Sequence, residues 1–204
     1  MSKRWLRDRK KDYYYKKAKS DEYRSRASFK LKQINKKFKI IIEKDHVLDL
    51  GAAPGGWTQL THEIVGNDGF ILSVDLAKID SFQSNNVVTL QGDFTKNSTL
   101  NTIIKIISKP DVIISDASPD ISGVWGIDHF RSIELCREVF KICNKILKPN
   151  GNLLIKVFQG ELINEFINEL KSQFKYAKTT KPKASRLRSA EVYIVCKGYK
   201  KLDI

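Results

Sequence analysis

The chain has 204 residues, which is enough for one sizeable hydrophobic core, and we expect a single domain over residues 1–204. Hydrophobic residues make up 41% of it, a share typical of globular proteins, and no apolar run is long enough to cross a membrane. The charged N-terminus lacks the apolar stretch of a signal peptide, so we predict a cytoplasmic protein with no membrane partner. The net charge of +14 points instead to an anionic partner.

The positive charge is concentrated at the two ends of the chain. Residues 1–40 hold 16 Lys and Arg against 4 acids, residues 41–170 hold 11 against 17, and residues 171–204 hold 10 against 2. We therefore predict a mildly acidic body with a basic N-terminal extension over about residues 1–40. If both ends meet on one face, they form a positive surface suited to a polyphosphate backbone. The alternative is a disordered basic arm with solvated helix faces.

Aromatic residues lie among the N-terminal cations. They are Tyr13, Tyr14, Tyr15 and Tyr23. Aromatic rings between cations can stack on unpaired bases, which favours RNA over a membrane surface as the partner. Packing of the same rings beneath the domain is the alternative.

Seven apolar runs predict strands, and helical patterns lie between most of them. The expected strands are 47–50, 70–74, 87–90, 112–115, 153–158, the weaker 175–179, and 192–196. The expected helices are 57–65, 131–147 and 162–174. This alternation predicts an α/β fold with a mostly parallel seven-stranded sheet and helices on both faces. No helical pattern separates 175–179 from 192–196, so the last strand is free to run antiparallel.

A glycine-rich turn joins the first expected strand to the first of these helices. It reads Asp-Leu-Gly-Ala-Ala-Pro-Gly-Gly-Trp over residues 49–57. The order differs from the dinucleotide motif G-x-G-x-x-G, and no Gly-Lys-Ser/Thr follows as in a P-loop. Gly51, Gly55 and Gly56 permit unusual backbone angles and close approach of a ligand, while Trp57 packs under the loop or against a cofactor.

Acidic residues lie at the carboxyl ends of the first four expected strands. They are Asp49, Asp75, Asp93 and Asp116. Ligands of parallel α/β sheets lie beyond the carboxyl ends of the strands, where an acid can accept hydrogen bonds from ribose hydroxyls. Because acids repel phosphates, the pattern predicts a nucleoside-containing cofactor without a phosphate-rich tail.

The cysteines and histidines indicate no metal site. Cys136, Cys143 and Cys196 have apolar neighbours and form no C-x-x-C pair, which predicts reduced thiols in the core. His46, His62 and His129 are scattered along the chain.

Five segments together resemble the FtsJ/RrmJ-type RNA 2′-O-methyltransferases, over almost the whole chain. They are residues 24–31 (Arg-Ser-Arg-Ala-Ser-Phe-Lys-Leu), the turn at 49–57, 115–119 (Ser-Asp-Ala-Ser-Pro), 156–160 (Lys-Val-Phe-Gln-Gly) and 181–193. The resemblance implies a Rossmann-like class I methyltransferase fold with S-adenosylmethionine as cofactor. It maps the family's catalytic tetrad, Lys-Asp-Lys-Glu, onto Lys30, Asp116, Lys156 and Glu191. Ser118 stands where the family usually has alanine, and Trp125 is a bulky departure near the expected substrate entrance.

The resemblance implies that Lys156 is the general base for a ribose hydroxyl. We expect Asp116 to orient its amine beside the methyl donor, while Lys30 and Glu191 shape the site. A lysine must be neutral to act as a base; burial and a second cation favour that form, and carboxylates oppose it. Five cations near Lys30 and Glu191 in sequence are candidates for phosphate contacts. They are Arg24, Arg26, Lys183, Arg186 and Arg188.

The main functional hypothesis is a methyltransferase for the ribose 2′-hydroxyl of a uridine in large-subunit ribosomal RNA, acting as a monomer. A tRNA anticodon-loop 2′-O-methyltransferase is the nearest alternative. A cap-directed enzyme is disfavoured because no further domain is expected. A ribosome-assembly factor with a dead methyltransferase fold would show a broken tetrad or glycine loop, and both are intact.

Overall fold

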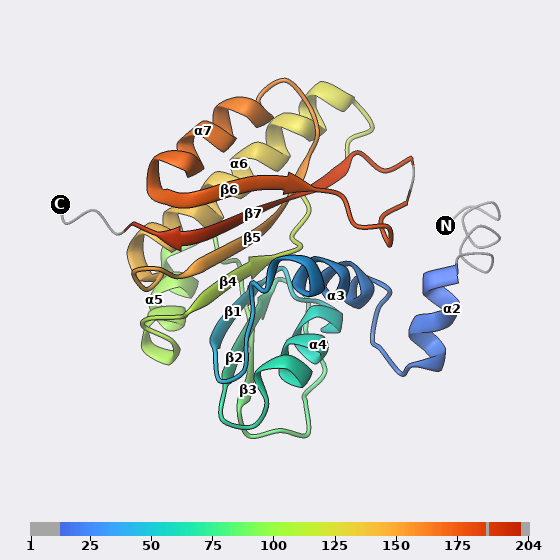
Figure 1. Cartoon of the computed structure of the whole chain (residues 1–204), viewed down its shortest axis with the longest axis vertical. Helices are drawn as coiled ribbons and strands as arrows, with labels where there is room; N and C mark the ends of the chain where they lie inside the picture. The colour runs from blue at the N-terminus through green and yellow to red at the C-terminus, as the bar shows by residue number, and fades with distance from the viewer. Residues whose placement is uncertain (1–12, 187, 201–204) are drawn as a thin grey trace.

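The computed structural model describes residues 13–186 and 188–200, and it contains a seven-stranded sheet between two layers of helices (Figure 1). The strands are β1 (His46–Leu50), β2 (Phe70–Asp75), β3 (Val87–Gln91), β4 (Val112–Ser115), β5 (Asn152–Phe158), β6 (Phe174–Thr180) and β7 (Glu191–Tyr199). Their order is β3-β2-β1-β4-β5-β7-β6. The first five are parallel and β7 is antiparallel to both β5 and β6, so the predicted fold is confirmed.

Each face of the sheet has its own core. Neighbouring residues of a strand point to opposite faces, and in β1 Val47 packs with one helix layer while Leu48 packs with the other. Burial on both faces explains why the strands are continuous apolar runs. The first layer is α5 (Asn97–Ile106), α6 (Trp125–Ile146) and α7 (Ile163–Gln173); the second is α2 (Tyr13–Ser20), α3 (Ala27–Phe38) and α4 (Gly56–Val65). No helix in the described ranges is long and apolar enough to cross a membrane.

The basic N-terminal stretch is partly built into the domain. The α3 helix buries Phe29, Leu31 and Ile34 in the second core, so the stretch expected as an extension contributes a core helix. Of the N-terminal tyrosines, Tyr23 is buried edge-on to Phe29, whereas Tyr13 is exposed. Residues 1–12 lie outside the described ranges. Because α3 carries Lys30, this packing also brings a candidate catalytic residue to the sheet.

The α6 helix begins six residues before its expected start at residue 131. Its first turns carry exposed apolar side chains, including Trp125 and Phe130, which obscure the amphipathic pattern. The carboxylate of Asp128 folds back onto the preceding loop and accepts hydrogen bonds from the Ser122 and Gly123 amides, at 2.7 and 3.1 Å. These contacts fix the loop that leads from β4 into α6.

Candidate active site

The four predicted catalytic residues meet at the carboxyl end of the parallel strands. Lys30 comes from α3, Asp116 follows β4, Lys156 lies in β5 and Glu191 begins β7. The Nζ of Lys30 forms an ion pair with Glu191 Oε2 at 2.8 Å, and the Nζ of Lys156 lies 3.5 Å from Asp116 Oδ1. Residues that are far apart in sequence therefore form two adjoining lysine–carboxylate pairs.

The antiparallel pairing of β5 and β7 sets this arrangement. Lys156 pairs with Tyr193, and Phe158 pairs with Glu191. Directly paired residues point to the same face of a sheet, so these four side chains share one face. The Lys30 Nζ lies 5.7 Å from the centre of the Tyr193 ring, which places α3 over that face.

Lys156 is held at its tip by the segment that follows β4. Its Nζ donates to the main-chain carbonyl of Asp116 at 2.7 Å, and its side chain is only 7% exposed. A buried cation is costly unless it is paired and hydrogen-bonded, and the carbonyl and carboxylate of Asp116 meet that need. The amine is thus confined to one position at the strand ends.

Tyr193 is a member of the site that the sequence did not reveal. Its hydroxyl donates to Asp116 Oδ1 at 2.8 Å, on the same oxygen that faces Lys156. Burial, with the negative charge of Asp116, raises the pKa of Tyr193 well above its usual value, so the hydroxyl keeps its proton. The only signal in the sequence was that Tyr193 lies two residues after Glu191 in a strand and so points to the same face. A tyrosine at such a position is usually interpreted as a core residue.

Glu191 remains a carboxylate despite its surroundings. Burial raises its pKa, but Lys30 and Lys156 lower it, and hydrogen bonds from Lys30 and Ser189 add to their effect. The net pKa lies below the usual glutamate value. Glu191 therefore carries a negative charge near neutral pH, and its ion-pair partner is Lys30.

A cavity of about 270 Å³ adjoins Asp116 at the ends of β1, β2 and β4. The predicted residues Gly51, Asp75, Asp93 and Asp116 line it. The remaining lining residues, which were not predicted, are Ala53, Leu76, Phe94, Thr95, Ala117, Ser118 and Leu135. Sequence reasoning missed them because loop residues and one residue of α6 carry no pattern of their own.

The two acids on the outer strands also order their own loops. Asp75 accepts hydrogen bonds from the Ala53 and Ala77 amides, at 2.9 and 2.8 Å. Asp93 accepts from the amide and hydroxyl of Thr95, at 2.9 and 2.7 Å, and these bonds lower its pKa. Both carboxylates are thus anchored where they line the cavity.

Four predicted cofactor residues lie outside the cavity lining: Asp49, Trp57, Gly55 and Gly56. Asp49 sits one residue inside β1 and is fully buried, with a 2.8 Å hydrogen bond from Thr58 Oγ1. Burial raises the pKa of Asp49 to about 7. The Trp57 ring packs 5.8 Å from that of Tyr193, and its Nε1 donates to the Ala27 carbonyl, so Trp57 supports the loop from below. Of the four predicted acids, Asp75, Asp93 and Asp116 therefore line the cavity, and Asp49 does not.

The glycines of the turn are needed for packing within the chain. A Cβ on Gly51 would lie 2.6 Å from Ala117, and one on Gly56 would lie 2.2 Å from the Ser25 hydroxyl. Gly51 also has a φ of +74°, which side chains disfavour. Gly55 and Gly56 do not line the cavity, so the turn brings α3 and the segment after β4 close to β1.

The five predicted phosphate contacts lie in three places. Arg26, Arg186 and Arg188 line a hollow of about 410 Å³ that also includes Lys30 and Glu191. Lys183 lies on a neighbouring hollow between α3 and the end of β6, together with Lys36, Lys37 and Lys181. Arg24 is instead engaged within the protein: it donates to the carbonyls of Asp80 and Ser81 and lies 3.7 Å above the Phe82 ring.

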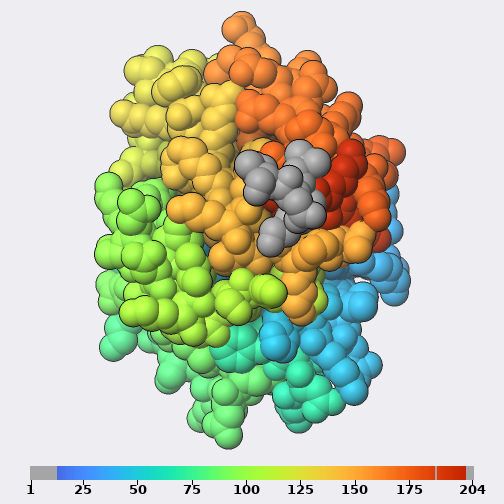
Figure 2. Space-filling model, turned by 90° about the vertical axis from the view of Figure 1, so that its left-hand side faces the viewer, coloured from blue at the N-terminus to red at the C-terminus, as the bar shows by residue number. Residues whose placement is uncertain are grey.

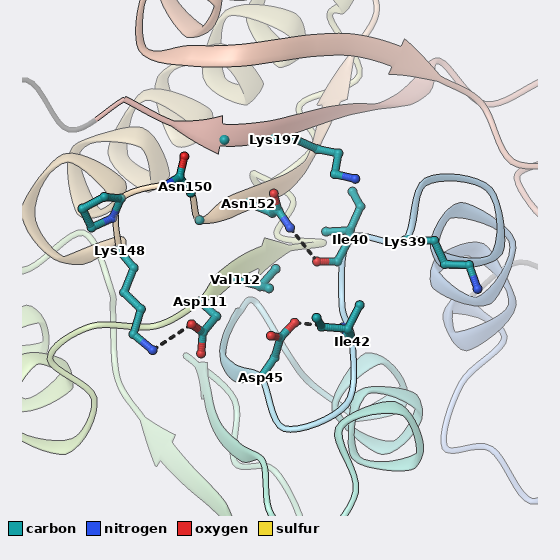
Figure 3. Close-up of a pocket in the computed structure, with 13 residues that line it drawn as sticks. Lys39, Ile40, Ile42, Asp45, Asp111, Val112, Lys148, Asn150, Asn152 and Lys197 are labelled. Atoms are coloured by element: carbon teal, nitrogen blue, oxygen red, sulfur yellow. Dashed lines mark hydrogen bonds and ion pairs between the residues drawn. The ribbon is translucent and has the colours of Figure 1, made fainter.

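A further hollow of about 500 Å³ lies at the opposite, amino end of the parallel strands (Figure 3). Figure 2 looks onto this end, where blue, green, orange and red segments from distant parts of the sequence meet. Its side chains tie the strand starts together: Lys148 pairs with Asp111 at 2.7 Å, and Asn152 donates to the Ile40 carbonyl at 2.9 Å. The described residues contain no group of three or more His, Cys, Asp or Glu that could hold a metal ion.

A family model, the FtsJ-like methyltransferases, matches residues 23–199. The chain belongs to this family. The match covers every element from α3 to β7 and confirms the predicted family and its methyltransferase activity.

Similar proteins in archaea carry one name. The chain is 53% identical over 204 residues to the "Ribosomal RNA large subunit methyltransferase E" of Methanococcus aeolicus, covering 98% of this chain and 76% of that one. It is 48% identical to the protein of the same name from Methanothermobacter thermautotrophicus, covering 98% and 95%.

Solved structures share the fold. A putative ribosomal RNA methyltransferase from Plasmodium falciparum is 28% identical, with a TM-score of 0.77 over 87% of this chain and 98% of that one. Fibrillarin from Aeropyrum pernix with bound S-adenosyl-L-methionine is 15% identical, with a TM-score of 0.59 over 85% and 75%, and shows the fold alone.

Proposed function

We propose that the chain transfers a methyl group from S-adenosylmethionine to the ribose 2′-hydroxyl of a uridine in large-subunit ribosomal RNA. The observation that carries the proposal is the position of Lys156: a buried amine, held by Asp116, beside the cavity and beside the Lys30–Glu191 pair. The names of the archaeal relatives support ribosomal RNA as the substrate.

The cavity suits a nucleoside-containing cation. Its charged lining is acidic, with Asp75, Asp93 and Asp116, and the described lining includes no basic residue. Carboxylates accept hydrogen bonds from ribose hydroxyls and attract positive charge, whereas they repel phosphates. Leu76, Phe94 and Leu135 add apolar surface suited to a flat base. When bound, S-adenosylmethionine supplies an electrophilic methyl group.

The tetrad supplies the proton transfer. Lys156 is the group placed to accept the proton of the ribose hydroxyl as the methyl group is transferred, and the ammonium so formed is held by the carbonyl and carboxylate of Asp116. Tyr193 fixes that carboxylate through its 2.8 Å hydrogen bond. Lys30 and Glu191 act as a fixed ion pair that shapes the entrance. A positioned base of this kind contributes about 10²–10⁴-fold to rate.

The decisive experiment is methyl transfer from labelled S-adenosylmethionine by the full chain. Large ribosomal subunits, naked rRNA and total tRNA from cells lacking the modification are offered in parallel, with Lys156→Ala as the second enzyme. We expect label in large-subunit rRNA, resistant to alkaline cleavage at a uridine, and none with Lys156→Ala. Transfer to tRNA alone would reassign the substrate, and binding of RNA and cofactor without any transfer would favour an assembly factor.

The arginines near the tetrad are proposed to hold the RNA backbone. Arg186 and Arg188 are exposed and border the same hollow as Lys30 and Glu191. Each phosphate neutralised adds a slope of about −0.9 to log affinity against log salt for duplex and about −0.7 for single strands. We expect the double variant Arg186→Ala/Arg188→Ala to flatten that slope by roughly 1–2 and to leave cofactor affinity intact. An unchanged slope would contradict this assignment.

A further inference from the structure

Trp125, the first residue of α6, is a half-exposed ring with an aromatic support. Its ring lies 6.2 Å from that of Phe158 and 6.4 Å from that of His129, with interplanar angles of 23° and 19°. The side chain is 51% exposed. The indole is therefore nearly parallel to both supporting rings and still presents a large area to solvent.

The support beneath this ring is fixed by hydrogen bonds. The amide of Leu162 donates to His129 Nε2 at 3.1 Å, and His129 Nδ1 lies 3.1 Å from the Phe158 carbonyl, which can only accept. His129 is thus locked as the tautomer that carries its proton on Nδ1. Asp128 also fixes the preceding loop by accepting a hydrogen bond from the Ser122 amide. The indole is therefore held in place before any ligand binds. A preordered ring loses little entropy on binding.

The position of the ring links it to the tetrad. Phe158, on which it rests, is paired with Glu191 in the β5–β7 ladder, and Lys156 is two residues away on the same face of β5. Glu191 itself lines the hollow that also holds Arg186 and Arg188. A strand of nucleic acid with its phosphates on these arginines would bring its bases toward the indole.

The surroundings of Trp125 are apolar and exposed. Four further side chains share the loop and the first turns of α6, with exposures between 45% and 62%: Ile121, Val124, Ile127 and Phe130. Exposed apolar groups gathered in this way mark an interaction site. Phe158 links this apolar group to Glu191 and thus to a hollow with several cations. An occupant that is flat, apolar and attached to phosphates fits both, namely an unpaired nucleobase.

We propose that Trp125 is a stacking platform for a base of unpaired RNA next to the methylated ribose. The inference rests on the proposed RNA substrate and adds a residue that positions it. Stacking on an aromatic side chain needs no particular base, so the platform orders the strand while other contacts select the site.

The first test measures stacking without relying on methyl transfer. Tryptophan fluorescence is followed in a Trp5→Phe background, which leaves the buried Trp57 and the half-exposed Trp125. Oligouridylate should quench this emission, and the quenching should vanish in Trp5→Phe/Trp125→Phe. Equal quenching in the two proteins would overturn the platform. This readout holds whichever RNA is methylated, so the platform and the proposed function fail separately.

The second test uses methylation kinetics on naked substrate rRNA with saturating S-adenosylmethionine. Because stacking contributes about 1–3 kcal/mol per base, Trp125→Ala should raise the KM for RNA roughly 5- to 150-fold, whereas Trp125→Phe stays within about threefold. Cofactor affinity and the salt slope should match wild type, because no charge is removed. Tyr176→Ala, an exposed aromatic on β6, is the control. A defect seen with ribosomal subunits but absent with naked rRNA would assign the ring to a protein contact and overturn the proposal.

Discussion

The same two strands carry a lysine–aspartate pair at each end, and the two pairs differ in burial. At the amino end, Lys148 and Asp111 precede β5 and β4, are 2.7 Å apart, and have side chains 38% and 31% exposed. At the carboxyl end, Lys156 and Asp116 are 3.5 Å apart but only 7% and 18% exposed. The shorter contact is thus the more solvated one.

Their hydrogen-bond partners differ as well. Lys156 donates to the carbonyl of Asp116 and lies 3.5 Å from its carboxylate, and Tyr193 donates to that carboxylate. The Asp111 carboxylate accepts from Lys148 and from the amide of His46, and so joins strand starts. A short ion pair at a surface fastens two segments, whereas a buried pair with a third partner fixes an amine in one place.

The largest difference between the two ends is expected in methylation activity when the lysine of each pair is replaced. Lys156→Met keeps the length of the side chain and removes the base, so we expect single-turnover methylation to fall by about 10²–10⁴-fold. Lys148→Met is the matched control and should retain activity within about twofold, since surface pairs contribute only about 0–1 kcal/mol. Circular dichroism and cofactor binding verify that both variants are folded. Activity of Lys156→Met within tenfold of wild type would exclude Lys156 as the base.

Asp49 and Asp111 allow the effect of a buried and of a partly exposed carboxylate on the pH dependence of stability to be compared. The pKa of Asp49 is raised by burial to about 7, so between about pH 4 and 7 the folded state keeps a proton that the unfolded state has lost. Stability from this group is therefore present at low pH and is lost as pH rises. Each pKa unit corresponds to about 1.4 kcal/mol. The free energy of unfolding of Asp49→Asn, relative to that of the wild type, should therefore be about 2–4 kcal/mol higher at pH 8 than at pH 5.

Urea denaturation at both pH values measures this difference. Asp111→Asn, which also removes one carboxylate but at a partly exposed, ion-paired position, is the control for the loss of charge. If Asp49→Asn shows the same slope as wild type, the buried carboxyl does not titrate in this range.

Much of the site at the carboxyl end of the strands could be predicted because charged residues at or inside apolar runs are visible in the sequence. Asp75, Asp93 and Asp116 follow apolar runs, and a lysine inside the run 153–158 stands out in a buried strand. The tetrad was found through a family resemblance, since the ion pair of Lys30 and Glu191 joins residues 161 positions apart. No local pattern encodes such a distance.

The features that were missed depend on register and close packing. Tyr193 enters the site because β7 pairs with β5 in one register, and a shift of one residue would turn it to the other face. Asp49 was expected in the cofactor cavity, but its side chain is fully buried and accepts a hydrogen bond from Thr58. Gly56 was assigned to a ligand, whereas Ser25 of the segment before α3 occupies that space. These are properties of tertiary contacts.

Each end of the parallel strands has an aspartate that orders a loop, and substituting each one shows which loop contributes to cofactor binding. Asp75 accepts the Ala53 amide at 2.9 Å, and Asp45 at the amino end accepts the Ile42 amide at 2.8 Å. Hydrogen bonds to charged groups contribute about 1.5–3 kcal/mol, so Asp75→Asn should weaken S-adenosylmethionine binding about 10- to 100-fold. Asp45→Asn should leave it unchanged. Isothermal titration calorimetry measures both, and equal affinities would place the cofactor outside the cavity that Asp75 lines.

The smallest effect is expected from the amino-end pair itself. A double-mutant cycle with Lys148→Met and Asp111→Asn should give a coupling free energy of about 0.2–1 kcal/mol, because both side chains are partly solvated. Added salt should reduce this coupling further, since exposed charges are screened. Chemical denaturation in low and high salt measures both quantities. A coupling above about 2 kcal/mol that resists salt would mean that side-chain exposure does not distinguish the two pairs. Burial would then no longer explain why the proposed base lies at the carboxyl end and not at the amino end.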